Sequence, residues 1–246
     1  MGSSNIPILK NLETGGDIHW NISSHPFLML TGSTGTGKST FLLQLIALIY
    51  LYSDGEAKII LLDYKHSDDF LFARSYDSYY AFENVTQGFD RFYQEFRKRL
   101  SGESDDYSQW WLVFDEYSSW ISMLDKKTSE EYKNKLGEIL RLSRSLNMRG
   151  IFVLQRADSI YFMGGIRDNF SVKIGLGRLS QEAKKMLFDT DLEIKPQKIG
   201  KGYIQIDGYE IKPCLVPKVR NRQKMIDCIK AFLARLADID EDAAPP

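Results

Sequence analysis

The stretch FLMLTGSTGTGKSTFLLQLIALIY, residues 27–50, decides the fold. Residues 27–31 form an apolar run typical of a strand buried on both faces, and residues 39–52 are rich in Leu and Ile on nearly every side, as in a buried helix. Between them lies a match to GxxxxGK[ST], whose backbone N–H groups converge on phosphate oxygens at a helix N-terminus. We therefore predict a nucleotide-binding loop made of Gly32, Ser33, Thr34, Gly35, Thr36, Gly37, Lys38, Ser39 and Thr40.

ATP and Mg²⁺ are the expected cofactors of this loop. Lys38 is predicted to neutralise charge on the β- and γ-phosphates, and Ser39 to place its hydroxyl on Mg²⁺. The segment WWLVFDE, residues 110–116, is an apolar strand that ends in two acids, where parallel sheets bind ligands. Asp115 is the expected Mg²⁺ ligand, and Glu116 is expected to orient or deprotonate the attacking water. A nucleotide kinase or a small GTPase would not need that second carboxylate.

Other polar residues follow buried strands at the same predicted edge. Gln155 comes after the strand at 148–154, where an amide can touch the γ-phosphate or the lytic water. Asp63, Tyr64 and Lys65 end the strand KIILLDYK, and a salt bridge or a solvated turn explains them as well as a functional contact does.

Strand and helix patterns alternate along the chain, which indicates an α/β fold with a mostly parallel central sheet flanked by helices. Further strands are expected at 17–22, 110–114, 172–176 and 203–206. Further helices are expected at 67–82, at 86–100, from a capping box at Thr128 to a left-handed cap at Asn147, and at 224–237.

Composition excludes several classes of protein. Hydrophobic residues at 43% and charged residues at 26% are ordinary for a globular protein, and the net charge of -1 means that any polyanion site must be local.

The two cysteines lack metal-ligand spacing and indicate a reduced, cytoplasmic chain. The longest apolar run, residues 41–52, falls short of the roughly 20 residues that span a bilayer, so no transmembrane segment is expected. The N-terminus does not have the pattern of a signal peptide.

From about Asp17 to Ile206 the chain resembles the motor domain of the FtsK/SpoIIIE group of DNA-pumping ATPases, within the wider FtsK–HerA class. The resemblance rests on motifs in a fixed order. Residues 17–40 are similar to the family's entry strand and GxTGSGKS loop, and LLDYK (61–65) is similar to IDPK, with Tyr64 in place of proline. VFDEYSSW (113–120) is similar to VDEF, and LQRAD (154–158) to TQRPS. Residues 170–177 with Ser180 are similar to IPTRIAFRVSS, and IGKG (199–202) to LGKGDM.

The resemblance implies a RecA-like P-loop NTPase that forms a ring, commonly a homo-hexamer, with ATP between subunits and double-stranded DNA in the channel. A basic residue of the neighbouring subunit should complete the site, and Arg178, Arg156 and Arg144 match or adjoin family positions. We expect an N-terminal arm and entry strand (1–24), the RecA-like ATPase motor domain (25–212), and a C-terminal helix with an acidic tail (213–246). Unlike chromosomal members, the chain shows neither membrane segments nor a winged-helix module. It therefore resembles a stand-alone mobile-element motor, recruited to the membrane through an anchored partner of the transfer machinery.

Charge is unevenly distributed, and the second half carries the basic excess. Residues 165–225 contain 13 Lys plus Arg against 7 Asp plus Glu. Candidates for salt-sensitive contacts to DNA phosphates are Lys126, Lys127, Lys184, Lys185 and Lys201, although each lysine alone is explained as a solvated charge.

The leading hypothesis is an ATP-driven double-stranded DNA translocase for conjugative or mobile-element transfer. A viral or phage genome-packaging ATPase shares its chemistry, and a type VII-like protein-secretion ATPase would move polypeptide instead. A non-motor adaptor is disfavoured because Lys38, Ser39, Asp115 and Glu116 are all present.

Overall fold

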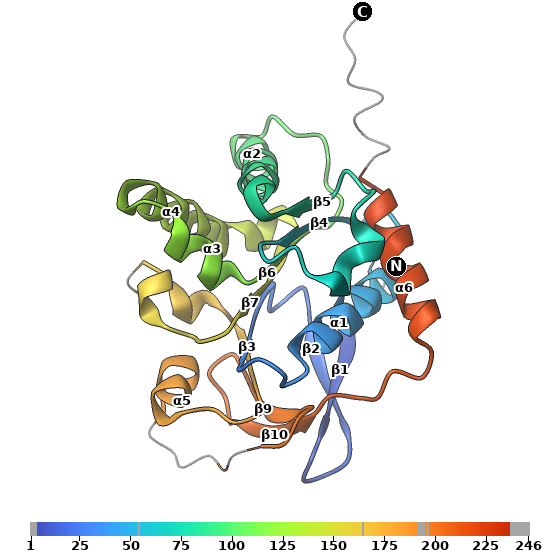
Figure 1. Ribbon diagram of the computed structural model, residues 1–246. Helices are drawn as coiled ribbons and strands as arrows, with labels where there is room; N and C mark the ends of the chain where they lie inside the picture. Colours follow the sequence, from blue (N-terminus) through green and yellow to red (C-terminus); the bar gives the residue numbers. More distant parts are fainter. Residues whose placement is uncertain (1–3, 54, 164, 191–194, 196, 237–246) are drawn as a thin grey trace, which may run out of the picture.

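The apolar runs of the sequence form the centre of a ten-stranded sheet with helices on both faces (Figure 1). The computed structural model describes residues 4–53, 55–163, 165–190, 195 and 197–236. The strand order is β2-β1-β10-β9-β8-β3-β7-β6-β4-β5.

Six neighbouring strands are parallel, and the phosphate-loop strand lies among them. In sheet order they are β8 (Val172–Leu176), β3 (Phe27–Gly32), β7 (Met148–Leu154), β6 (Trp110–Asp115), β4 (Lys58–Asp63) and β5 (Tyr79–Ala81). Strands β3, β6, β7 and β8 are buried along their whole length, as strands covered on both faces must be. The prediction of a mostly parallel α/β sheet is confirmed.

The remaining four strands extend the sheet in antiparallel pairs beyond β8. They are β9 (Lys201–Ile206), β10 (Lys212–Leu215), β1 (Asn5–Asn11) and β2 (Asp17–Asn21). The N-terminal hairpin β1–β2 and the late strand β10 therefore belong to the same sheet as the strands between them.

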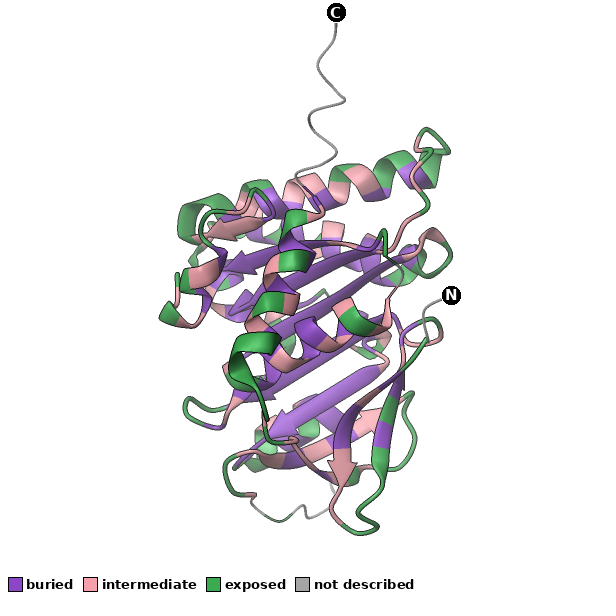
Figure 2. Cartoon of the chain, turned by 90° about the vertical axis from the view of Figure 1, so that its right-hand side faces the viewer, coloured by how far each residue is buried: buried purple, intermediate pink, exposed green. Residues whose placement is uncertain are grey.

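Two apolar cores lie on opposite faces of the sheet, because successive side chains of a strand point to opposite sides. Along β3, Leu28 and Leu30 pack in the first core, whereas Phe27 and Met29 pack in the second. Figure 2 shows the buried strands between the layers of helices. The first face is covered by α1 (Lys38–Tyr52) and α6 (Arg222–Ala234), and the second by α2 (Val85–Ser101), α3 (Tyr117–Met123), α4 (Lys126–Leu142) and α5 (Gln181–Phe188).

The helix predicted at 67–82 is wrong. The segment contains a 3₁₀ helix, η1 (Asp68–Ala73), then the edge strand β5, and a second 3₁₀ turn, η2 (Phe82–Asn84). The hydroxyl of Ser67 accepts a hydrogen bond from the Asp69 N–H at 3.2 Å and starts η1 as a tight turn. Aromatic residues favour strands, and the Tyr79–Ala81 segment pairs with β4 instead of continuing a helix.

The start of α4 also differs from the prediction at Thr128. Asp125 caps the helix, because its carboxylate accepts from the N–H groups of Lys127 at 3.0 Å and Thr128 at 3.1 Å. After α4 and the turn η3 (Ser143–Leu146), Asn147 has the predicted left-handed conformation, with φ of 59°.

Gly202 gives a test of the join between the parallel and antiparallel parts of the sheet. A Cβ at this position would collide with the backbone oxygen of Gly175 and the Cα of Leu176, and backbone atoms in a sheet cannot move aside. We expect Gly202→Ala to lower the free energy of unfolding by about 3 kcal/mol in urea titrations. The control Gly55→Ala meets no atom within 4 Å and should change it by less than about 0.5 kcal/mol. Equal effects of the two substitutions would contradict this packing.

Candidate active site

The carboxyl ends of the parallel strands meet at one edge of the sheet and bring the predicted site residues together. The phosphate loop follows β3, and Gln155 follows β7, which pairs with β3 up to Thr31 and Leu154. Asp63 and Asp115 are direct partners in the β4–β6 pair. Ligands bind at this edge in open parallel sheets.

The phosphate loop is folded around the ammonium group of Lys38. Its Nζ donates to the carbonyl oxygens of Gly32 at 2.5 Å and Ser33 at 3.1 Å, and the Thr36 hydroxyl donates to the same Ser33 oxygen at 2.8 Å. Burial lowers the pKa of Lys38, and the carboxylates of Glu116 and Asp115 oppose that shift. The loop thus holds a buried lysine beside two acids, at the start of α1.

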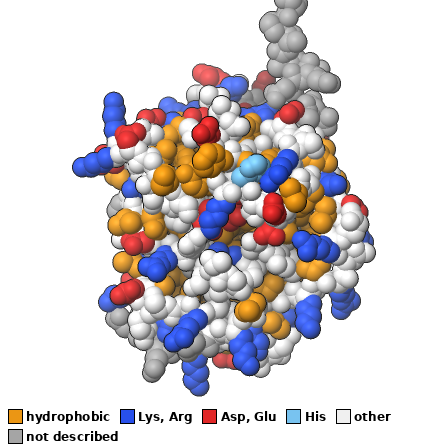
Figure 3. Space-filling model, in the orientation of Figure 1, with side chains coloured by type: hydrophobic (Ala, Val, Ile, Leu, Met, Phe, Trp, Pro, Cys, Tyr) orange, Lys and Arg blue, Asp and Glu red, His pale blue; other side chains and the backbone are white. Residues whose placement is uncertain are grey.

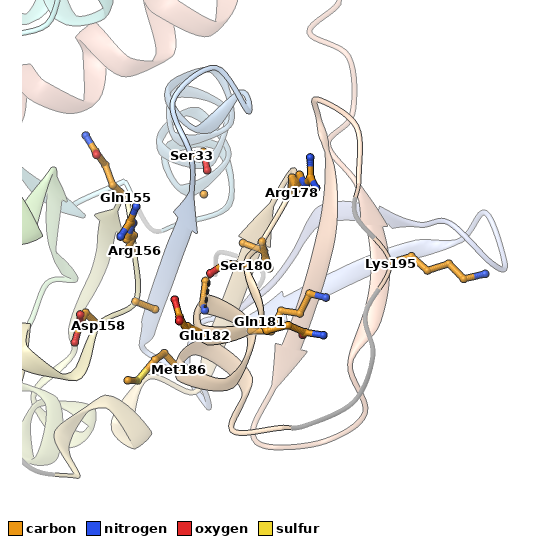
Figure 4. Close-up of a pocket in the computed structure, with 15 residues that line it drawn as sticks. Ser33, Gln155, Arg156, Asp158, Arg178, Ser180, Gln181, Glu182, Met186 and Lys195 are labelled. Carbon is orange, nitrogen blue, oxygen red and sulfur yellow. Dashed lines mark hydrogen bonds between the residues drawn. The ribbon is translucent and has the colours of Figure 1, made fainter.

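Two cavities lie on either side of the loop and share Ser33 and Arg178. One, of about 800 Å³, runs from Ser33 past Gln155 and Arg156 to α5 (Figure 4). The other, of about 950 Å³, is lined by the loop, by Arg178 and by residues 197–199. A hydrogen bond of 3.1 Å from the Gly200 N–H to the Thr36 carbonyl connects the segment at 197–200 to the loop.

Ser39 and Thr40 lie in the first turn of α1, with Ser39 partly buried and Thr40 exposed.

Asp115 is buried in a cluster of like charge. Only 7% of the residue is exposed. Burial raises its pKa to about 7, the negative charges of Glu116 and Asp63 add to the rise, and Lys38 and Lys65 oppose it. Its neighbour Asp63 is fully buried as well, and burial raises its pKa despite hydrogen bonds to Oδ2 from the Ser67 N–H at 2.7 Å and the Tyr79 hydroxyl at 2.9 Å.

Glu116 has both side-chain oxygens engaged. Oε1 lies 2.7 Å from Nζ of Lys65, and Oε2 accepts from the hydroxyl of Ser119 at 3.0 Å. The backbone of Glu116 is left-handed, with φ of 62°, and its carbonyl accepts from the N–H groups of Ser119 and Trp120 at the start of α3. Such conformations of non-glycine residues are costly and cluster at functional sites.

The charges at this edge fit a divalent cation. The charges of Lys38 and Lys65 act on Asp115 beside Glu116 and Asp63, and Oδ1 of Asp63 is buried without a hydrogen-bond partner. Among the described residues, no three His, Cys, Asp or Glu side chains form a metal cage of their own. A magnesium ion that serves a nucleotide needs none, because phosphates and water supply most of its ligands. Ser39 and Asp115 are the residues that would share it.

The polar residues after β7 and β8 lie beside the chain's own phosphate loop. Gln155, Arg156 and Arg178 are all exposed, and Figure 4 shows Gln155 and Arg156 across the cavity from Arg178. Arg144, in η3 before β7, is exposed at the opposite edge of the sheet.

The five lysines predicted to meet DNA come from three separate elements. Lys126 and Lys127 are exposed at the start of α4, Lys185 is exposed on α5, and Lys201 is partly buried at the start of β9. Lys184 is only 6% exposed, so this structure does not present it to a phosphate backbone. Figure 3 shows Lys and Arg side chains spread over the lower part of the face, where α5, β9 and β10 lie in Figure 1.

The partners of Glu116 were not predicted from the sequence. Lys65 stood out only as one of three polar residues after an apolar strand, and the sequence alone did not pair it with Glu116. Ser119 lies in the first turn of α3, three residues after the N-cap Glu116, but serines at such positions are common.

Comparisons with known proteins identify relatives of this chain. Residues 2–71 match the FtsK/SpoIIIE family. The predicted resemblance to FtsK/SpoIIIE motors is thereby confirmed. The chain is 25% identical over 247 residues to the FtsK domain-containing protein YdcQ of Bacillus subtilis (strain 168), an alignment that covers 93% of this chain and 49% of that protein.

Two solved structures share the fold. The monomeric conjugation coupling protein TcpA of pCW3, solved with ATPγS, superimposes with a TM-score of 0.70 at 20% identity over 95% of this chain and 71% of that one. The cytoplasmic domain of the type VII secretion ATPase EccC from Thermomonospora curvata gives a TM-score of 0.70 at 20% identity, over 94% of this chain and 31% of that one. The chain therefore shares its fold with these two proteins, and its phosphate loop lies within the segment that matches the FtsK/SpoIIIE family.

The chain spans about half the length of the curated relative that it matches. In the described part of the chain, no helix combines the length and apolar character that a membrane crossing requires.

Asp115 gives a pH-dependent test of the site. Because its pKa is about 7 in the folded state against 3.8 for an unperturbed aspartate, the folded chain binds a proton more tightly, and stability falls as pH rises from about 4 through 7. Asp115→Asn removes this penalty. In EDTA at pH 8 we expect the variant to be more stable to urea than wild type by about 1–3 kcal/mol, with the gap closing toward pH 4. The exposed control Asp68→Asn should show no such gap, and an Asp115→Asn variant less stable than wild type at pH 8 would contradict the burial of this charge.

Proposed function

We propose that the chain hydrolyses ATP and uses the energy to move double-stranded DNA. The observation that carries the proposal is the placement of Lys38, Asp115 and Glu116 at one sheet edge, around a phosphate loop whose segment matches the FtsK/SpoIIIE family. A phosphate-binding lysine, a buried aspartate and a second acid are the parts that phosphoryl transfer to water requires.

The residues divide the work of hydrolysis. Backbone N–H groups of residues 32–40 and the ammonium of Lys38 hold the β- and γ-phosphates, and Ser39 with Asp115 would hold a Mg²⁺ ion, which would offset phosphate charge. Glu116 accepts a proton from water as the water oxygen bonds to the γ-phosphorus and the bond to the oxygen of ADP breaks. Gln155 lies where it orients that water or contacts the γ-phosphate, and Lys38 stabilises the charge that develops.

A homo-hexameric ring with duplex DNA in its channel is the assembly we propose, with residues 25–212 as the motor. An arginine of the neighbouring subunit then completes the site. Arg178 and Arg156 lie beside their own phosphate loop, whereas Arg144 is exposed at the opposite edge, where a neighbouring site could meet it. The basic excess of residues 165–225 supports a local DNA surface.

Conjugative or mobile-element transfer is the proposed setting, in the cytoplasm and with a membrane-anchored partner. The likeness to TcpA, a conjugation coupling protein, supports it. The equally high TM-score against EccC supports a second candidate, an ATPase that moves polypeptide during secretion.

Steady-state ATP hydrolysis, with and without long duplex DNA over a salt series, tests the proposal. We expect duplex DNA to stimulate the wild-type rate, and the stimulation to fade as salt rises because phosphate contacts are screened. Glu116→Gln should still bind ATP but lose about 100-fold or more in kcat, since a general base is removed without loss of the phosphate loop. Lys38→Ala should fail to bind ATP.

The outcomes separate the candidates. Glu116→Gln turning over at the wild-type rate would overturn the catalytic assignment. Turnover that depends on Glu116 but ignores duplex DNA would favour a polypeptide cargo.

A further inference from the structure

Glu116 is restrained from two sides by residues that the proposed chemistry does not use. Lys65, two residues past the end of β4, contributes an ion pair of 2.7 Å to Oε1, and Ser119, in α3, donates to Oε2 at 3.0 Å. The carboxylate is 7% exposed, whereas the Lys65 side chain is 46% exposed. One donor on each oxygen fixes the plane of the carboxylate against the end of β4.

Lys65 lies in the same charge cluster as the phosphate loop. Its positive charge contributes to the lowered pKa of Lys38, so the two ammonium groups are close enough to repel each other. It also acts on the carboxyl of Asp115. The γ-phosphate of a nucleotide bound at Lys38 would therefore compete with Glu116 for Lys65.

We infer that Lys65 and Ser119 form a clamp that holds Glu116 in a resting orientation, and that the clamp must open before Glu116 can activate water. A general base needs a lone pair directed at the proton that it removes, and two fixed donors direct this carboxylate at Lys65 and Ser119 instead. The inference rests on the proposed function and names Lys65 as a positioning residue of that site.

The clamp can open without disturbing the core. Lys65 and Ser119 both line an open cavity of about 690 Å³, together with Tyr64, Phe82 and Met123. Phe82 is 53% and Met123 is 74% exposed, so this side of the cavity is open to solvent. An ion pair with one partly exposed partner is weak, so the phosphate charge weakens the contact of Lys65 with Glu116, and duplex DNA completes the opening.

The first test compares Lys65→Met with Lys65→Arg in the full chain. Lys65→Met should raise the DNA-free kcat about three- to tenfold and reduce the ratio by which duplex DNA stimulates turnover, because a partly exposed ion pair no longer has to be broken. The KM for ATP should stay within about twofold, whereas Lys65→Arg keeps the ion pair and should behave as wild type. Ser119→Ala should act in the same direction with a smaller effect.

A matched control lies at the other end of the same strand. Lys58 pairs with Asp106 at 2.8 Å, far along β4 from Glu116, so Lys58→Met removes a comparable ion pair without touching the clamp. It should leave the DNA-free kcat unchanged, and thermal melting of each variant checks that it is folded.

The second test repeats Lys65→Met in the Glu116→Gln background. If Lys65 acts through Glu116, the substitution should leave the residual rate unchanged there. An unchanged or lower DNA-free kcat in the single variant would overturn the clamp, as would a further change in the Glu116→Gln background, which would place Lys65 on the nucleotide itself.

These results are distinct from a failure of the proposed function. If wild type has no turnover, or turns over without Glu116, the motor assignment fails. If turnover needs Glu116 and Lys65→Met behaves as wild type, only the clamp fails.

Discussion

The crowding of carboxylates at the carboxyl edge of the parallel sheet is the constraint on which the site depends. Register places Asp63 of β4 directly beside Asp115 of β6, and the chain then turns at Glu116 into α3. Burial first, and then the charges of Glu116 and Asp63, raise the pKa of Asp115, and Lys38 and Lys65 oppose only part of that rise. The edge thus keeps an unbalanced negative charge next to a loop built for phosphate, which suits magnesium and nucleotide bound together.

Residues at this edge lower the stability of the fold while they supply the polar groups of the candidate site. Glu116 has a left-handed backbone and a buried carboxylate, and Asp63 keeps a buried oxygen without a hydrogen bond. Each of these features costs free energy, and proteins retain such costs mainly where function requires them. The surrounding sheet supplies the rigidity, since β3, β6, β7 and β8 are buried throughout between two apolar cores.

Patterns with a strong physical period were readable from the sequence, and contacts between distant segments were not. The glycine loop before a Leu-rich helix specified β3 and α1, and WWLVFDE specified the acids at the end of β6. The predicted helix at 67–82 failed because its apolar residues serve a 3₁₀ turn and a short edge strand, which share no single period. The pairing of Lys65 with Glu116 depends on β4 lying beside β6, a neighbour relation that sequence order does not reveal.

Strands outside the parallel region were harder to predict for a similar reason. β1 and β10 gain their stability by pairing with each other across some 200 residues of chain, and neither has the long apolar run of a central strand. TcpA and EccC share the fold of this chain, although one is a conjugation coupling protein and the other a type VII secretion ATPase. The fold therefore does not separate a DNA motor from an ATPase that acts on another cargo. Movement along DNA does.

Displacement of a third strand from linear duplex DNA tests that movement most directly. An oligonucleotide bound as a triplex near one end of the duplex reports the arrival of a motor that started elsewhere on the same molecule. We expect ATP-dependent displacement by the wild-type chain, with a lag that grows with the length of duplex between the loading site and the triplex. Hydrolysis that duplex DNA stimulates, without displacement at any length, would contradict it.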